Sequence, residues 1–388
     1  MMKVNLKKFL EKEILSALEK LGIGRREIVF DKPKEEKFGD YSTNIAMLLA
    51  KELKQPPRKI ASDILESMDI DKEKISKAEI AGAGFLNFFA ADSYCISRLE
   101  EILSAGSSFG RSAVNSGLRA NLEWISANPT GPLHTGHGRA AALGKTIANL
   151  LEWTGYDVTR EYYYNDAGNQ MNNLAKSVYA RYMQIMDPGF VFPDEGYVGD
   201  YVKDIAADIY GMHGDKFRFN FDSEYFKSEG ENHTFALIKK TLERMGIEHD
   251  VFFNESSLYD DGTIDRTIEE LKNRSLAYEQ EGAVWLKMPS EEGFQKDKVI
   301  VKSTGEPTYR LPDIAYHIDK IKRGYDLIVD IFGSDHGDTY REVLYGVKCL
   351  GQDESKIKVI IHQMVTFRMG DESVKMSKRS DKVKSLEE

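Results

Sequence analysis

The sequence predicts an α/β fold, in which a Rossmann-like domain with a parallel sheet carries an insertion and follows a small α+β domain. Three observations predict it. Strand-like and helical segments alternate from residue 118 onward. One of these segments, residues 326–332 (DLIVDIF), is an apolar run such as a parallel strand covered on both faces needs. A linker of small residues at about 107–117 separates this region from a self-contained N-terminal unit.

The length and composition are those of an ordinary globular protein with two or three domains. The chain has 388 residues, 41% of them hydrophobic, and its formal net charge of −10 disfavours a general nucleic-acid coat. Two cysteines, Cys95 and Cys349, make neither a disulfide framework nor a zinc module, so we expect a cytoplasmic protein. No apolar run approaches membrane-spanning length and the start lacks the apolar region of a signal peptide, so we expect no membrane association.

The N-terminal unit, expected at residues 1–110, combines helices with a pair of strands. A helix is predicted from Leu6 to Leu21, where apolar residues recur at helical spacing, and Gly22 ends it. Ser42 is expected to cap a second helix. The patterns predict further elements of this unit at residues 56–68 (helix with proline in its first turn), 78–90 (two strands around a glycine turn) and 93–106 (helix).

The second domain, expected at residues 111–372, contains the strands of the parallel sheet. Residues from about 185 to 255 change character, being first turn-rich and then helical, which predicts an insertion between two halves of the sheet. The strands are predicted at residues 118–126, 156–164, 326–332 and within 357–369.

Four loops with unusual chemistry each follow a predicted strand. They are residues 128–139 (NPTGPLHTGHGR, the histidine loop), 164–170 (YNDAGNQ), 333–338 (GSDHGD) and 374–379 (VKMSKR). In an open parallel sheet such positions gather at the carboxyl ends of the strands, where ligands bind. We therefore expect one binding rim formed by all four loops.

The two histidines of the histidine loop, His134 and His137, admit three interpretations. A structural zinc site would need four ligands, and no cysteine lies nearby. A purely structural pair does not explain the prolines and glycines around them. A phosphate-binding loop does, because Gly136 and Gly138 let the backbone approach a ligand and the following helix directs free N–H groups toward it. We favour the phosphate interpretation, in which the histidines donate hydrogen bonds to phosphate oxygens.

A phosphate site of this kind requires a cationic counterpart. Residues 375–384 (KMSKRSDKVK, the lysine segment) supply it with a local net charge of +4. A lysine-rich run is usually a solvated surface, but its combination with the histidine loop makes the pattern specific.

These two segments together resemble the paired signature of class I aminoacyl-tRNA synthetases. His134-Thr135-Gly136-His137 forms one half, and Lys375-Met376-Ser377-Lys378 the other. The surrounding segments resemble bacterial-type arginyl-tRNA synthetases in particular: SANPTGPLHTGHGR, REYYYNDAGNQ, TYRLPDIAYHIDK, KMSKR and, in the N-terminal unit, FGDYSTNIAMLLAK. The resemblance runs from about residue 5 to residue 388.

The resemblance implies a catalytic role for both halves of the signature. His134 and His137 are expected to stabilise the phosphates of ATP in the transition state, and Lys375 and Lys378 to hold the departing pyrophosphate. Gly136, Met376 and Ser377 are expected to contribute to the same ATP site. The implied activity is the activation of L-arginine by ATP, with Mg²⁺ on the phosphates, and transfer of the arginyl group to tRNA(Arg).

The resemblance also implies a pocket for the arginine. It places Glu123, Tyr309 and Asp313 at the guanidinium, which offers only donors and therefore needs acceptors. Tyr309 and Asp313 lie four residues apart, so on a helix they share one face, although such a pair is more often a surface feature. The remaining expected contacts with the amino acid come from Ser126, Asn128 and His336, and the same rim includes Asp166, Gly168 and Gln170.

The chain departs from the family pattern at three points. Arg379 follows the second lysine, and Gly337 follows His336 where many relatives carry another histidine. The chain also stops ten residues after Lys378, whereas the family continues into an anticodon-binding domain. We therefore expect residues 373–388 to hold the lysine segment and the start of that connection, either in a truncated chain or in a natural fragment.

Two further expectations follow from the resemblance. The N-terminal unit is expected to touch the elbow of the tRNA near the D-loop, and the protein is expected to be a monomer. Three other assignments compete with this one. Shorter nucleotidyl transferases lack the lysine segment, and other synthetases should not place Asp and Tyr around a guanidinium. A non-catalytic arginine- or tRNA-binding paralogue would have no evident use for both histidines and both lysines.

Overall fold

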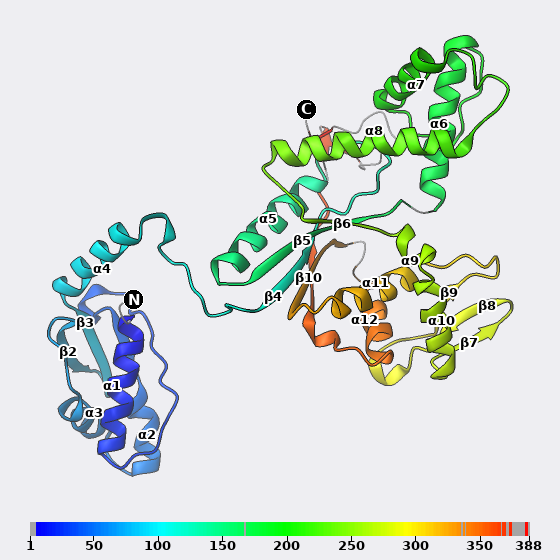
Figure 1. The fold of residues 1–388 in the computed structure, drawn as a ribbon. Helices are drawn as coiled ribbons and strands as arrows, with labels where there is room; N and C mark the ends of the chain where they lie inside the picture. Colours follow the sequence, from blue (N-terminus) through cyan, green and yellow to red (C-terminus); the bar gives the residue numbers. More distant parts are fainter. Residues whose placement is uncertain are drawn as a thin grey trace. The chain divides into compact units, whose positions relative to one another are not determined.

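The computed structural model contains two compact units, Met1–Gly110 and Arg111–Glu388. It describes residues 5–166, 168–334, 337, 339–365, 367–369, 372–374 and 385–386. Figure 1 shows the helices and strands of each unit.

The N-terminal unit packs its helices on a three-stranded antiparallel sheet in the order β1-β3-β2. Its core lies between the apolar faces of the helices and the sheet, with Leu10, Ile14, Ile64 and Phe88 fully buried. The elements are α1 (Leu6–Lys20), β1 (Tyr41–Thr43), α2 (Ile45–Leu53), α3 (Pro57–Ser67), β2 (Ile75–Ala81), β3 (Phe85–Ala90) and α4 (Asp92–Ala105). The predicted helices and the predicted strand pair are therefore confirmed.

The predicted cap of α2 is wrong. Ser42 belongs to β1, pairs with Asn87 of β3, and its hydroxyl donates to the Asn87 side chain at 2.7 Å. Asn44 stands at the N-cap of α2 instead. Pairing with a strand 45 residues away thus determines the role of Ser42, and no local pattern reveals that partner.

The second unit is built on a five-stranded parallel sheet in the order β11-β10-β4-β5-β6 (Figure 1). Every neighbouring pair in this sheet is parallel, which confirms the predicted fold class. Its strands are β4 (Arg119–Glu123), β5 (Asp157–Tyr164), β6 (Val251–Asn254), β10 (Leu327–Gly333) and β11 (Ile357–His362).

Helices cover both faces of this sheet. Helices α5 (His137–Trp153) and α8 (Ser223–Arg244) pack on one face against Leu122, Val158 and Val329. Helices α11 (Arg310–Lys322) and α12 (Thr339–Cys349) pack on the other, against Ile328 and Ile357. The alternation of side chains along each strand assigns neighbouring residues to opposite layers.

The connection from β5 to β6 forms a helical bundle, which we call the helical segment. It consists of α6 (Asn169–Met186), α7 (Asp200–His213) and α8. Its own core is rich in aromatic side chains, among them Tyr182 and Phe226, both with no exposed surface. The region expected as an insertion, residues 185–255, therefore lies mostly within this bundle.

A small antiparallel sheet, which we did not predict, lies between β6 and α11. Its strands β7 (Ala277–Gln280), β8 (Ala283–Leu286) and β9 (Lys298–Val301) pair in sequence order. Helices α9 (Ser256–Asp260) and α10 (Thr263–Asn273) precede it. Short 3₁₀ helices occur at Glu36–Phe38, Gly106–Ser108, Ser290–Glu292 and Glu354–Lys356.

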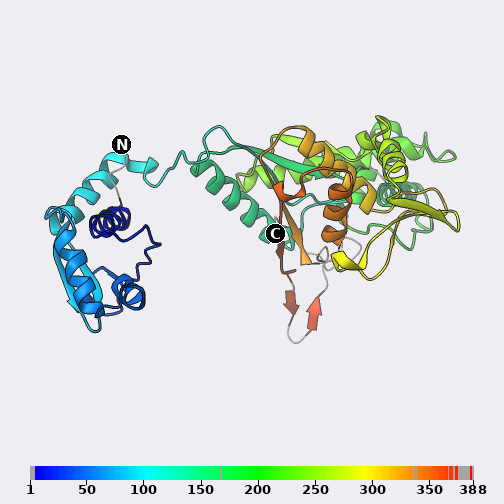
Figure 2. The same ribbon diagram turned by 90° about the horizontal axis from the view of Figure 1, so that it is seen from below.

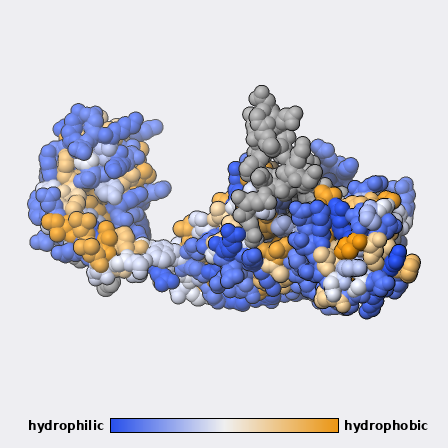
Figure 3. All heavy atoms as spheres, turned by 90° about the horizontal axis from the view of Figure 1, so that it is seen from above, coloured by the Kyte–Doolittle hydropathy of each residue, from blue (hydrophilic) through white to orange (hydrophobic). Residues whose placement is uncertain are grey.

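The lysine segment follows a strand, but not a strand of the parallel sheet. After β11 the chain forms an antiparallel pair, β12 (Phe367–Met369) and β13 (Glu372–Val374), which Figure 2 shows side by side. Figure 3 shows a surface of mostly hydrophilic side chains with scattered apolar patches. Among the described residues no helix is both long enough and apolar enough to cross a bilayer.

Candidate active site

The histidine loop begins with a strained turn at the carboxyl end of β4. Ile125 and Ser126, which follow the strand after Trp124, have positive φ angles of 72° and 39°. Non-glycine residues rarely adopt this conformation, and a β-branched residue does so least readily. The turn is fixed by the Ser126 hydroxyl, which donates to Glu123 at 2.9 Å and accepts the backbone N–H of Tyr163 at 3.0 Å. The strain is therefore held in place by side-chain bonds to β4 and β5.

The two histidines stack face to face at the start of α5. Their ring centroids are 3.8 Å apart with an interplanar angle of 25°. The Nδ1 atom of His134 accepts the backbone N–H of Gly136, and Nδ1 of His137 accepts the backbone N–H of His134, each at 3.1 Å. An N–H can only donate, so in each neutral ring the proton sits on Nε2. The loop thus fixes both imidazoles as Nε2–H donors.

The helix start adds a further attraction for anions. His137 is the first residue of α5, a helix of 17 residues, and Gly136 is its N-cap. A Cβ on Gly136 would lie 2.8 Å from the His134 ring, so glycine is needed for the close approach of ring and backbone. The positive end of the helix dipole favours a phosphate here.

The end of the described chain returns to the histidine loop. Ser385 forms an isolated antiparallel bridge with His134, and the backbone N–H of Leu386 donates to the carbonyl of Leu133 at 2.8 Å. Leu386 also packs on the core beneath α5. The four residues predicted to act from the lysine segment, Lys375, Met376, Ser377 and Lys378, lie outside the described residues.

Three acidic residues form a row across the middle of the sheet. Asp330 of β10 is the register partner of Glu123 of β4, which is in turn the partner of Glu161 of β5. All three are buried. Ionised carboxylates this deep in a protein need cations or several hydrogen bonds.

Helix α11 supplies those cations. The Nζ atom of Lys320, which has no exposed surface, donates to Glu123 and to Asp330, each at 2.6 Å. His317 contacts the other oxygen of Asp330 at 3.0 Å and the carbonyl of Asp313 at 2.7 Å. Both of these partners accept, so both ring nitrogens of His317 carry hydrogen and the ring is cationic. Burial alone would lower the pKa of His317, but the Asp330 carboxylate raises it.

Glu161 is neutralised separately. Arg323 grips both of its oxygens, at 2.6 and 2.8 Å, and Tyr316 and Asn121 donate to it at 2.7 and 2.6 Å. Burial alone would raise the pKa of Glu161, but the bonds from Arg323 and the charge of Lys320 lower it. The acidic row is thus fully paired within the protein and ties α11 to three strands.

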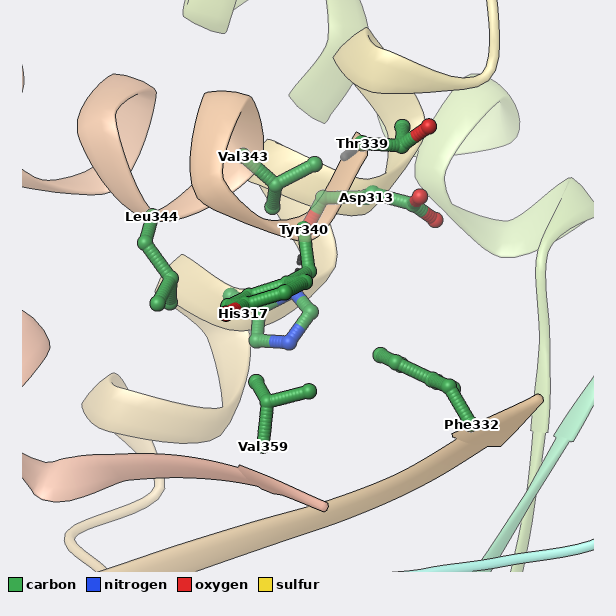
Figure 4. Close-up of a pocket in the computed structure, with 8 residues that line it drawn as sticks. All are labelled: Asp313, His317, Phe332, Thr339, Tyr340, Val343, Leu344 and Val359. Atoms are coloured by element: carbon green, nitrogen blue, oxygen red, sulfur yellow. Dashed lines mark hydrogen bonds between the residues drawn. The ribbon is translucent and has the colours of Figure 1, made fainter. Parts of the chain in front are cut away.

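Asp313 lies one turn before His317 on α11. Unlike the three carboxylates of the acidic row, its carboxylate has no cation bonded to it among the described residues. Burial raises the pKa of the Asp313 carboxyl to about 7, against the effect of the His317 charge, and the charges of Glu123 and Glu255 raise it further. Figure 4 shows its carboxylate beside a pocket between α11, α12 and the strands β10 and β11. A cation bound here would restore its ionised form.

Tyr309 stands at the N-cap of α11, and its carbonyl accepts the backbone N–H of Asp313 at 3.2 Å. The two residues are therefore one helical turn apart. Tyr309 is 72% exposed, whereas Asp313 is partly buried. Its ring is thus available at the surface next to the carboxylate.

A second carboxylate near Asp313, Glu255, was missed in the sequence. It is only 7% exposed and accepts hydrogen bonds from Tyr163 at 2.8 Å and Tyr259 at 3.5 Å. Burial raises the pKa of Glu255, with the charge of Asp166 acting in the same direction. Asp313 and Glu255 together give this region two carboxylates that a bound cation would stabilise.

The other predicted rim residues have identifiable partners. The Asn128 amide donates to Gln170 at 2.8 Å, which joins the histidine loop to α6. Asp166 accepts the backbone N–H of Ser256 at 2.9 Å and its hydroxyl at 2.6 Å, so it holds the start of α9. Gly168 is the N-cap of α6 with φ of 86°. His336 lies outside the described residues.

Lys320 and His317 were not predicted from the sequence. The signal that could have found them is the spacing of polar residues along one helical face: Asp313, Tyr316, His317, Lys320 and Arg323. Within the described part of the chain, no three His, Cys, Asp or Glu side chains are grouped closely enough to hold a metal ion.

Both units match known protein families. Residues 8–90 match the family described as the arginyl tRNA synthetase N terminal domain. Residues 98–189 and 197–388 match the family described as tRNA synthetases class I (R), catalytic domain.

Relatives with high identity cover almost the whole chain. The arginine–tRNA ligase of Desulfotalea psychrophila is 48% identical over 92% of this chain, and that of Chlorobaculum tepidum is 45% identical over 97%. These alignments span 64% and 69% of the two relatives, so the chain spans about two thirds of their length.

Solved structures show the same fold. A structure described as an arginyl-tRNA synthetase from Campylobacter jejuni superposes with a TM-score of 0.67 and 33% identity, covering 74% of this chain and 63% of that chain. The Thermus thermophilus arginyl-tRNA synthetase gives a TM-score of 0.63 at 20% identity, covering 92% and 66%.

Proposed function

Because this chain belongs to the arginyl-tRNA synthetase family, we propose that it activates L-arginine with ATP and transfers the arginyl group to tRNA(Arg). In the first step an oxygen of the arginine carboxylate attacks the α-phosphorus of ATP. The bond to the β-phosphate breaks, and arginyl-adenylate and pyrophosphate form. In the second step a hydroxyl of the terminal adenosine of the tRNA attacks the arginyl carbonyl, and AMP leaves.

The chemistry of the first step requires positioning and charge stabilisation rather than a general base. A carboxylate is already ionised at neutral pH and attacks without losing a proton. The protein must offset the negative charge on the phosphates while the α-phosphorus exchanges its bond to the β-phosphate for a bond to the carboxylate. The site therefore needs donors and cations aimed at phosphate oxygens.

His134 and His137 are well prepared for that task. Their Nδ1 atoms are engaged by backbone N–H groups, which leaves the proton of each neutral ring on Nε2. Two Nε2–H donors next to the start of α5 would meet the phosphates together with the helix dipole. Neither ring needs to change its tautomer during the reaction.

The observation that carries the proposal is the pairing of Ser385 with His134. Ser385 follows Lys378 by seven residues, which at full extension reach about 25 Å. This anchor supports a site in which Lys375 and Lys378 approach the same phosphates as the histidines and hold the departing pyrophosphate. Gly136, Met376 and Ser377 would complete this ATP site.

The guanidinium of arginine would bind among the carboxylates near α11. The pKa values of Asp313 and Glu255 are both raised, and no ion pair to either carboxylate is seen among the described residues, so both gain from a buried cation. Tyr309 would lie over the group, and Glu123, held by Lys320, would lie at the base of the pocket. Ser126, Asn128 and His336 would address the α-amino and carboxylate ends.

The other partners follow from the same assignment. Mg²⁺ would arrive on the phosphates of ATP as part of that substrate. The N-terminal unit would contact the elbow of the tRNA near its D-loop. The free thiols of Cys95 and Cys349 fit a cytoplasmic protein, and we expect it to act as a monomer.

The test is an arginine-dependent adenylation assay. The chain is incubated with ATP, Mg²⁺, hydroxylamine and one amino acid, with and without tRNA(Arg), and the hydroxamate and AMP are measured. We expect product with arginine and none with lysine or glutamate. The arm with tRNA is essential, because the family resemblance implies that tRNA can be required for activation.

A pair of histidine variants tests the site itself. His137→Ala should lower the rate about 100-fold or more, as the loss of a preorganised donor to a developing charge does elsewhere, while arginine binding changes little. The control is His213→Ala at the end of α7, whose ring contacts Tyr225 and which should retain the rate. Arginine binding without any AMP formation would instead support the non-catalytic paralogue.

A further inference from the structure

Three of the four carbonyl groups of residues 127–130, where the histidine loop begins, are held by hydroxyls from three different elements. The Tyr162 hydroxyl of β5 donates to the carbonyl of Ala127, the Thr234 hydroxyl of α8 to that of Pro129, and the Tyr201 hydroxyl of α7 to that of Thr130. Each of these bonds is 2.6 Å long. Loop carbonyls of this kind ordinarily face water, so three side-chain donors to one short segment mark a loop whose position is fixed.

Two of the three donors belong to the helical segment rather than to the sheet. Thr234 has no exposed surface, and Tyr201 lies at the first turn of α7. A third link joins the same loop to α6, through Asn128 and Gln170. The three helices of the segment therefore bond to three successive residues of the loop, Asn128, Pro129 and Thr130.

Gly131 shows how closely α7 approaches. Its φ is 153°, and a Cβ at this position would lie 2.7 Å from the hydroxyl oxygen of Tyr201 and 2.9 Å from its ring. The loop backbone and the tyrosine ring are thus in direct contact just three residues before His134. Any shift of α7 must displace the loop or break this contact.

We propose that Tyr201 and Thr234 are positioning residues for adenylate formation, through which the helical segment fixes the placement of His134 and His137. The predicted effect on the rate of adenylate formation rests on the function proposed above. The predicted effect on the position of the histidine loop does not. The hydroxyls do not touch the substrate; they set where the histidine loop stands. A ligand that moves the helical segment would change the activity of the histidines through these bonds.

The first test measures the loop directly and needs no activity. Hydrogen exchange of the backbone amides in residues 130–138 is compared between the unaltered chain, Tyr201→Phe and Thr234→Val. Both variants keep nearly the same shape and lose only a hydroxyl. We expect exchange about fivefold faster in the loop for each variant, which corresponds to about 1 kcal/mol. Gly131→Ala should act in the same direction from the loop side.

The matched control is Tyr210→Phe. Tyr210 lies on the same helix, and its ring packs against Tyr182 in the core of the helical segment. This variant should leave exchange in residues 130–138 unchanged. Equal exchange in Tyr201→Phe and Tyr210→Phe would overturn the proposal.

The second test separates positioning from binding. Tyr201→Phe should lower kcat for adenylate formation about fivefold, while KM for arginine stays within about twofold, because the pocket around Asp313 lies on other elements. A rise in KM with unchanged kcat would contradict the positioning role. If the unaltered chain is inactive, the proposed function fails while the exchange experiment still decides the structural proposal.

Discussion

Asp330 and Glu123 lie side by side on parallel strands β10 and β4, and Nζ of Lys320 donates to one oxygen of each at 2.6 Å. With the cationic His317 on the other oxygen of Asp330, this group of two acids and two bases is neutral. The buried carboxylates of Glu123 and Asp330 are therefore already paired with cations. Under the proposed function, the carboxylates that would recognise the guanidinium are therefore Asp313 and Glu255.

Removal of the central cation should destabilise the protein strongly. Lys320→Met leaves Glu123 and Asp330 buried without their shared partner, and breaking one member of a buried ion pair typically costs about 3–5 kcal/mol. The free energy of unfolding, measured with urea at pH 7.5, should fall by this amount. Lys322→Met, at an exposed position of the same helix, is the control and should change it by less than about 0.5 kcal/mol. Equal stability of the two variants would show that the buried network carries no net stability.

Asp313 should dominate the binding of arginine. Asp313→Asn keeps the shape of the side chain but cannot provide the charge for a guanidinium, so we expect binding weaker by about 2 kcal/mol or more, at least about 30-fold. Asp319→Asn on the same helix, where Arg323 is the partner, should bind arginine within about threefold of the unaltered chain. Isothermal titration calorimetry measures both. Unchanged affinity in Asp313→Asn would place the guanidinium elsewhere.

Arginine binding should release a proton near neutral pH. The pKa of Asp313 in the free protein is raised to about 7, whereas the complex needs its carboxylate ionised. Protonation therefore competes with arginine as the pH falls, and the Kd should rise about fivefold from pH 7 to pH 6 and level off above pH 8. Calorimetry in two buffers of different ionisation enthalpy counts the released proton. In Asp313→Asn this pH dependence should disappear.

His249 should make the fold sensitive to acid. Its ring packs on Trp124 and Tyr162 behind the strained turn, and burial lowers the pKa of His249 to about 4. In the unfolded chain the imidazole takes up a proton near pH 6.5, whereas in the folded protein it does so only near pH 4. The loss of stability is therefore absent above pH 6.5 and grows as the pH falls toward 4. At pH 5 the loss of stability is at most about 2 kcal/mol.

The variant His249→Phe isolates this contribution. Its urea midpoint should decline less between pH 7.5 and pH 5 than that of the unaltered chain, since the phenyl ring binds no proton. Parallel declines in the two proteins would mean that His249 is not the group responsible.

The sequence predicted the order of elements well, because strand and helix periodicities are local. The strand before the histidine loop and the apolar run at β10 are examples. The role of Ser42 could not be predicted, since it depends on pairing with Asn87 of a distant strand. The row formed by Asp330, Glu123 and Glu161 could not be predicted from the sequence either, because it depends on the register of three parallel strands.

For the candidate site, motifs identified residues but not their partners. His134 and His137 were found from glycine and proline spacing, whereas the backbone bonds that fix their tautomers appear only in the folded loop. Glu255 was missed because it follows a short edge strand, β6, with no motif around it. Its importance comes from burial next to Tyr163, which depends on the packing of β5 and β6.

The most direct measurement of the central claim compares arginine with citrulline, which has nearly the same shape but no charge, by calorimetry on this chain at pH 8. If carboxylates near α11 select a guanidinium, arginine should bind at least about 30-fold more tightly than citrulline, because citrulline leaves these acids without a cation. Equal affinity for the two ligands would contradict the account.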